Sequence, residues 1–214
     1  MVRMKRIAGV ASLALALAAC SGGNAVTGET FERYYDPGGL FSAEFPASNE
    51  ITIIPPDSAG PTGAGPRIVT GAISGPPQPQ QTGGGGLFDF GQIRRPGGNL
   101  YLVYVLDAGD ITSPDDLSAA LLTGAPGSDV KVKERTTLGG REGVLVVADL
   151  LGEGRTVEVA SAFTVLNGTG YMVASGFSPG DWPQHREEFL RVVGSLQTEV
   201  PAGIGILPQG SPTA

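Results

Sequence analysis

The stretch from Gly176 to Gly180, GFSPG, places a serine in the G-x-S-x-G spacing that many hydrolases use for a nucleophile. Ser178 would need a histidine as its base, and the only histidine, His185, lies on the segment that follows directly. Hydrolases of this class carry the histidine on a separate late loop, after an acidic residue, and Pro179 lacks the N–H that would complete an oxyanion hole. We therefore interpret GFSPG as a turn between a strand and a helix, with His185 on the helix surface. A hydrolase that uses Ser178 is the alternative.

Metal and phosphate chemistry would need other clusters of residues. Asp107, Asp110, Asp115 and Asp116 lie close in sequence, but they lack the alternating acids and terminal glutamate of a calcium loop. One histidine and one cysteine exclude the usual zinc clusters. The glycine run before Leu87 lacks the Lys-Ser/Thr of a phosphate-binding loop. The sequence therefore predicts no catalytic residue, no metal site and no cofactor, and the four acids are interpreted as helix-capping and solvated charge.

Cys20 is the only cysteine, and it ends an apolar run near the start of the chain. Arg3, Lys5 and Arg6 precede the apolar residues 7–19, which is the pattern of an export signal and too short to span a bilayer. The last four residues, LAAC, resemble the lipobox of bacterial lipoproteins, in which the cysteine sulfur receives a diacylglycerol. We expect Cys20 to be lipidated and to anchor the chain on the periplasmic or extracellular side of the cell membrane. An ordinary secretory signal or a single membrane helix is the alternative.

The net charge of the chain restricts the classes of molecule that it can bind. The chain has a formal net charge of -7, and removal of the three basic residues of the signal would change it to -10. Nucleic acids and anionic lipid headgroups both need positive charge on the protein. The sequence therefore predicts no nucleic-acid partner, and we expect an envelope protein or a small apolar ligand instead.

Glycine and proline set the domain boundaries, because 34 Gly and 17 Pro among 214 residues are concentrated in a few stretches. Such stretches favour mobile segments over packed structure. We expect a signal peptide at 1–19, a flexible tether at 20–30, one domain at 31–197 with a Gly/Pro-rich insertion at 55–86, and a disordered tail at 198–214.

Alternating apolar residues predict the strands of that domain. The first part contains four expected strands, at residues 38–46, 51–54, 87–93 and 99–108. A short helix follows, because Ser113 is a suitable cap, Pro114 suits the first helical position, and the next two acids oppose the positive helix end.

A meander and a last helix make up the rest. Turns at Gly139-Gly140, at residues 152–155 and at Asn167-Gly168 separate runs rich in β-forming residues. A helix over about 183–197 should place its apolar residues and Trp182 on the sheet. We expect the helix residues Phe189, Val192, Val193 and Leu196 to share one core with residues of the meander. The meander positions are Leu145, Val147, Val159, Phe163, Tyr171, Val173 and Phe177.

Two segments carry a resemblance to a known superfamily. YYDPGGLFSAEFPA near the start of the domain, and AFTVLNGTGYMVASGFSPGDWPQHREEFLRVVGSLQ at its end, resemble the opening and the close of PsbP-like domains. The superfamily includes PsbP, the Mog-type Ran-binding proteins and the LpqN-type lipoproteins. The resemblance implies an α+β fold, an antiparallel sheet of about six to seven strands flanked by helices in an α/β/α sandwich. It also implies binding or assembly and supplies no shared catalytic residues.

These expectations lead to one functional hypothesis, a lipid-anchored, non-catalytic binding or assembly module of the bacterial cell envelope. The alternatives are an envelope hydrolase that uses Ser178 and, in a photosynthetic host, a PsbP-like photosystem assembly or extrinsic factor.

Overall fold

The computed structural model describes residues 30–54, 56, 66–76, 100–122, 128–152 and 155–199. The signal, nearly all of the tether, the residues after Glu199 and the strand expected at 87–93 lie outside these ranges. Within them, no helix is both long and apolar enough to cross a membrane.

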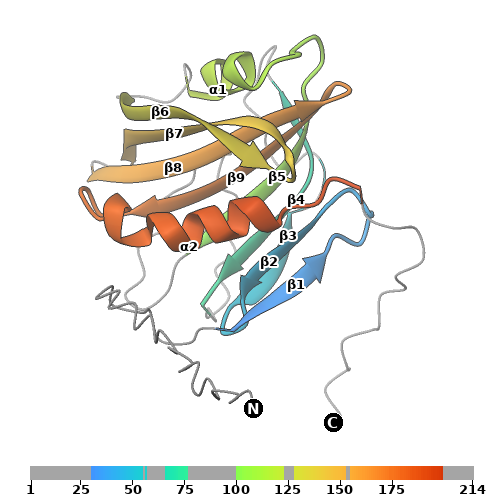
Figure 1. The fold of residues 1–214 in the computed structure, drawn as a ribbon, viewed down its shortest axis with the longest axis horizontal. Helices are drawn as coiled ribbons and strands as arrows, with labels where there is room; N and C mark the ends of the chain where they lie inside the picture. Colours follow the sequence, from blue (N-terminus) through green and yellow to red (C-terminus); the bar gives the residue numbers. More distant parts are fainter. Residues whose placement is uncertain are drawn as a thin grey trace, which may run out of the picture.

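The described chain forms two antiparallel sheets and two helices (Figure 1). The elements in chain order are β1 (Phe31–Tyr35), β2 (Ser42–Pro46), β3 (Glu50–Ile54), β4 (Arg67–Gly75), β5 (Tyr101–Asp107), α1 (Pro114–Leu122), β6 (Asp129–Leu138), β7 (Arg141–Gly152), β8 (Arg155–Leu166), β9 (Thr169–Phe177) and α2 (Trp182–Ser195).

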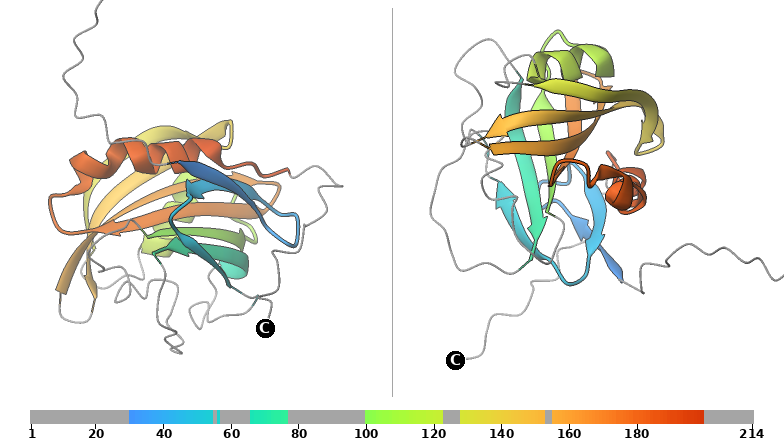
Figure 2. Two further views of the ribbon diagram at one scale, coloured as in Figure 1. Left: turned by 90° about the horizontal axis from the view of Figure 1, so that it is seen from below. Right: turned by 90° about the vertical axis from the view of Figure 1, so that its left-hand side faces the viewer.

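The larger sheet has seven strands in the order β3-β4-β5-β9-β8-β7-β6, and every neighbouring pair is antiparallel. Helix α1 packs on β7 and β8, whereas α2 crosses the other face and also reaches β2 (Figures 1 and 2). The predicted fold class, an antiparallel α+β sheet flanked by helices, is confirmed.

The sheet separates two hydrophobic cores, one under each helix. The α1 side includes Leu117, Leu121, Val146, Val159 and Phe163. The α2 side includes, among others, Leu145, Val147, Tyr171, Val173, Phe177, Trp182, Phe189, Val192, Val193 and Leu196. The prediction that Val159 and Phe163 share the core of the last helix is wrong, because these two side chains of β8 point to the opposite face of the sheet.

The expectation of a Gly/Pro-rich insertion over 55–86 is corrected, because this stretch contains the strand β4. The segment RIVTGAISG forms a strand between β3 and β5, although glycine- and proline-rich sequence precedes and follows it. Its apolar and β-branched residues supply the strand pattern that the average composition hides. Gly71 permits close packing of β5, since a Cβ at this position would lie 2.7 Å from the carbonyl oxygen of Val103.

β1 is a strand that the sequence pattern did not predict. It pairs with β2 in a separate two-stranded sheet, from Phe31 opposite Pro46 to Tyr35 opposite Ser42. β2 begins four residues later than expected, after a turn closed by the hydrogen bond from the Asp36 N–H to the Phe41 carbonyl.

The predicted helix cap and the predicted turns at Gly139-Gly140 and Asn167-Gly168 are confirmed, whereas the middle of the turn predicted at 152–155 lies outside the described residues. The Ser113 Oγ accepts a 3.1 Å hydrogen bond from the N–H of Asp116 and donates to its carboxylate, so it caps α1. Asn167 and Gly168 have φ values of 50° and 78°, as the tight turn between β8 and β9 requires.

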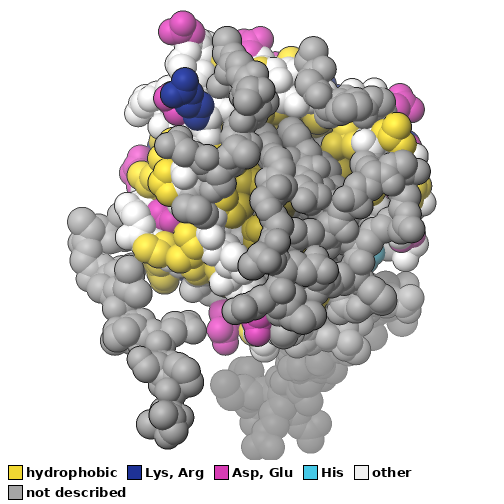
Figure 3. Space-filling view, turned by 180° about the vertical axis from the view of Figure 1, so that it is seen from behind, with side chains coloured by type: hydrophobic (Ala, Val, Ile, Leu, Met, Phe, Trp, Pro, Cys, Tyr) yellow, Lys and Arg dark blue, Asp and Glu magenta, His cyan; other side chains and the backbone are white. Residues whose placement is uncertain are grey.

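The face seen from behind in Figure 3 shows more acidic than basic colour on the described surface, with hydrophobic side chains between them. This distribution agrees with the negative net charge of the chain.

Candidate functional site at the start of the last helix

The turn between β9 and α2 brings together the residues that the sequence singled out. Ser178 is exposed at the end of β9, and its carbonyl accepts a 3.0 Å hydrogen bond from the N–H of Asp181. Gly180 has φ +90°, which lets the chain turn into the helix. The prediction of a turn between a strand and a helix is confirmed.

Glu158 fills the anion-binding position of this turn. Its side chain is about 95% buried, and Oε2 accepts hydrogen bonds from the N–H groups of Gly180 (3.1 Å) and Trp182 (2.9 Å). The N-cap residue Asp181 makes no side-chain cap, so a carboxylate from β8 provides one instead. The register of β8 and β9, which sets Glu158 opposite Phe177, places the carboxylate there. An anion at the positive end of a helix is stabilised by the helix dipole and by these donors.

Lys131 and Asp149 complete the charged cluster around Glu158. The Lys131 Nζ lies 2.8 Å from Asp149 Oδ2 and 3.4 Å from Glu158 Oε1. A bulge in β6 between Val130 and Val132 lies at Lys131 and shifts the pairing with β7 by one residue. The hydrogen bond to Asp149 is the largest influence on the pKa of the Lys131 ammonium and raises it, so the cation persists at neutral pH.

Sequence reasoning missed this cluster. Glu158 is the one charged residue in the strand segment TVEVASAFTVL, and a lone acid in an apolar strand is a signal for a buried, partnered carboxylate. Lys131 and Asp149 carried no comparable signal, because charged residues near the ends of strands are common.

A row of aromatic rings continues from this turn into the α2 side of the core. The His185 ring stacks on Phe177 with centroids 5.1 Å apart. Phe177 contacts Trp182 at 5.8 Å, and Trp182 contacts Phe189 at 5.5 Å. Trp182 is buried, as predicted for a core anchor. His185 is half-buried against the ring of Phe177, so its interpretation as a plain surface residue is corrected.

In the observed arrangement, the polar groups of this turn hold the structure of the turn together. A serine nucleophile needs free N–H donors beside it to stabilise an oxyanion. Here the N–H groups of Gly180 and Trp182 already bind Glu158, and Pro179 supplies none.

The four aspartates near α1 do not converge on one point. Asp115 pairs with Lys133 and Arg135, each at 2.7 Å, and Asp116 belongs to the helix cap. Asp107 accepts the N–H of Gly109 at 3.1 Å. Among the described residues, no group of three or more His, Cys, Asp or Glu side chains is arranged to hold a metal ion.

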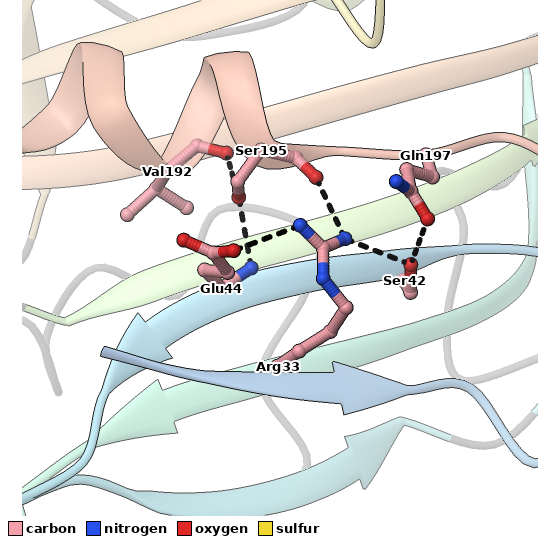
Figure 4. Close-up of polar contacts among 6 residues, drawn as sticks. All are labelled: Arg33, Ser42, Glu44, Val192, Ser195 and Gln197. Carbon is pink, nitrogen blue, oxygen red and sulfur yellow. Dashed lines mark hydrogen bonds and ion pairs between the residues drawn. The ribbon is translucent and has the colours of Figure 1, made fainter.

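A second polar network fastens the β1–β2 sheet to the C-terminal end of α2 (Figure 4). One nitrogen of Arg33 donates to Ser42 Oγ and to the Ser195 carbonyl, both at 3.1 Å, and the other donates to Glu44 at 2.9 Å. The Glu44 N–H donates to Ser195 Oγ at 2.8 Å. Backbone hydrogen bonds in both directions between Ser42 and Gln197 complete the junction.

The comparisons with known proteins show similarity in backbone arrangement. No family model and no curated protein matches the sequence. Cyanobacterial PsbP from Synechocystis sp. PCC 6803 is similar at 13% identity and TM-score 0.47, over 85% of this chain and 98% of that chain. The Ran-binding protein Mog1p of Saccharomyces cerevisiae is similar at 9% identity and TM-score 0.47, over 80% and 96%. LpqN of Mycobacterium tuberculosis, described as involved in cell envelope biogenesis, is similar at 16% identity and TM-score 0.42, over 80% and 92%. These are the three types of protein in the predicted resemblance, which is confirmed as a distant likeness of fold. No residue or activity is transferred from them.

Proposed function

We propose that this chain is a bacterial lipoprotein, anchored through Cys20, that serves as a non-catalytic binding or assembly module on the periplasmic or extracellular side of the cell membrane. The observation that carries the anchor is the sequence LAAC at the end of a cationic and then apolar start. The partner that we propose is another envelope protein, and a small apolar ligand is the alternative.

The site at the start of α2 supports the non-catalytic part of the proposal. The hydrolase alternative depends on Ser178 and on free N–H donors in the same turn. Glu158 occupies two of these donors, and its burial makes their release costly.

The anchor is tested with a Cys20→Ser variant of the full chain. We expect the variant to lose incorporation of labelled fatty acid and to leave the membrane fraction, because the sulfur is the atom that would carry the lipid. Membrane attachment that survives the substitution would disprove the lipid anchor.

The absence of catalysis is tested by rescue of a deletion strain. Ser178→Ala should stay folded and should rescue as well as the wild type, because the hydroxyl has no role in a binding module. Thr112→Ala, an exposed change near α1, serves as the matched control. A Ser178→Ala chain that folds normally but fails to rescue would replace the binding module with the hydrolase alternative.

A further inference from the structure

The core on the α1 side extends to strands that α1 does not reach. Its members on β3 and β5 include Ile54, Leu102 and Tyr104, and the last two are only 6% and 5% exposed. Helix α1 packs on β7 and β8. From β8, the strand β5 lies two positions away in the sheet and β3 four positions away, which are about 10 Å and about 19 Å. An α-helix is only about 10 Å wide, so α1 alone cannot cover these side chains.

The other described elements do not supply this cover. α2 and β2 contribute to the core on the opposite face of the sheet. Ile111 also packs against the α1-side core, but it follows the end of β5 at Asp107, whereas Leu102 lies near the start of that strand. Leu117 of α1 contacts β9 at Gly170, about 13 Å along the strand from the residue that pairs with Leu102. The burial of Leu102 therefore requires residues outside the described ranges.

The connection between β4 and β5 has the right position and length to provide them. Ser74 pairs with Tyr101, so residues 77–99 leave and re-enter the sheet at the end of β5 where the cover is needed. Neighbouring antiparallel strands need a loop of only about 2–5 residues, and this connection is much longer. The chain from Ile93 to Leu100 can span roughly 20 Å, which is more than the distance from β5 to β3.

The connection also carries the apolar side chains that a cover needs. The described ranges leave out three further internal stretches of more than one residue, at 57–65, 123–127 and 153–154, and none of them contains a leucine, isoleucine, valine, methionine or aromatic residue. The two terminal segments do contain apolar residues, but they adjoin β1 and Gln197, at the small sheet on the α2 side. Within 77–99, the stretch LFDFGQI at 87–93 holds four large apolar residues, which are Leu87, Phe88, Phe90 and Ile93.

We propose that residues 87–93 pack on the α1-side face of β3, β4 and β5 and complete this core. Because β4 and β5 pair directly with each other, the segment lies over the sheet and not between these two strands. The glycine- and proline-rich sequence on either side of LFDFGQI then carries the chain to and from this position. The inference does not depend on the lipid anchor or on a partner.

Photo-crosslinking in the full chain tests the position of the segment. p-Benzoylphenylalanine replaces Phe88 or Phe90, and the matched control carries it at Gln80, in the same connection but outside LFDFGQI. We expect crosslinks within one chain to residues 100–107 or 50–54, several-fold more abundant from the two phenylalanine positions than from the control. Crosslinks that do not exceed the control, or that fall mainly on α2 and β2, would overturn the proposal.

Surface exposure gives a second test. The double variant Phe88→Asp, Phe90→Asp should bind several-fold more 8-anilinonaphthalene-1-sulfonate, a dye for exposed apolar surface, because charged side chains cannot cover the core. Gln80→Asp, Gln81→Asp adds the same charge to the same connection and should leave dye binding unchanged. Circular dichroism shows whether each variant keeps its sheet. Equal dye binding by the two double variants would contradict the proposal, and the crosslinking decides the case if the phenylalanine variant unfolds.

Discussion

At the scale of single residues, the charged side chain that matters most for the architecture is Glu158. It holds the first turn of α2 by binding two backbone N–H groups, and it is buried and paired with Lys131. A buried carboxylate normally destabilises a fold unless it is fully partnered. Its partners explain why one acid is tolerated in an otherwise apolar strand.

Tyr104 gives a prediction for the pH dependence of stability. Burial raises its pKa from 10.0 to about 12. Between these values the unfolded chain has lost a proton that the folded chain still binds, so the free energy of unfolding falls as the pH rises through this window. Tyr104→Phe removes this contribution.

We therefore expect the stability of Tyr104→Phe relative to the wild type to increase from about pH 10 to about pH 12, measured by denaturant unfolding at several pH values. The same pair at neutral pH supplies the baseline, where both states of Tyr104 keep the proton. A difference that stays constant across the alkaline range would contradict this assignment.

At the scale of elements, α2 is the main cover of one face of the sheet. Phe189 is fully buried between this helix and the strands, together with Val193 and Leu196. Phe163 occupies the corresponding interior on the α1 side. On the α2 side, Phe41, Ala43 and Phe45 of the β1–β2 region share this core with the helix.

Phe189→Ala should reduce the free energy of unfolding by about 3–5 kcal/mol, because a large buried ring is replaced by a cavity. Glu187→Ala, exposed on the same helix, should change it by less than about 0.5 kcal/mol. Chemical denaturation measures both variants. A small loss for Phe189→Ala would show that α2 is not fixed on the sheet by this side chain.

Sequence patterns predicted caps and turns better than they predicted which face of the sheet a side chain occupies. Ser113, Asn167 and Gly168 were recognised because caps and tight turns depend on a few local residue types. Val159 and Phe163 were placed on the wrong face because β8 is apolar on both sides, so its pattern contains no information about direction. β4 was missed because the glycine and proline that surround RIVTGAISG dominate the composition of residues 55–86. Glu158 acts through contacts with residues more than twenty positions away, which no local pattern contains.

At the scale of the whole molecule, the small β1–β2 sheet joins the body through the network around Arg33. The side chain donates hydrogen bonds to β2 and to the end of α2, and the Arg191 guanidinium lies 3.8 Å from the ring centroid of Phe31. The connection combines this polar network with apolar burial, because Phe41, Ala43 and Phe45 lie in the core on the α2 side.

Arg33→Ala should increase hydrogen exchange in residues 31–46 while β5, β8 and β9 keep their protection, because the polar contacts that are lost join only the small sheet to the end of α2. The loss of charged hydrogen bonds should cost about 1–3 kcal/mol in total stability. Arg33→Lys should recover part of the protection, since one cation remains beside Glu44. Uniform exchange across both sheets would show that they open as a single unit.

The hydrogen bonds between Ser42 and Gln197 have a consequence for orientation. β2 lies between β1 on one side and Gln197 on the other, and Gln197 is bridged to Ser42, opposite Tyr35 at the end of β1, whereas the chain enters at Phe31, opposite Pro46 at the other end of the strand pair. Entry and exit therefore lie at opposite ends of the small β1–β2 sheet. In Figure 1, α1 and the β8–β9 turn lie far from the start of β1, so a domain suspended from its entry point would present them away from the point of suspension.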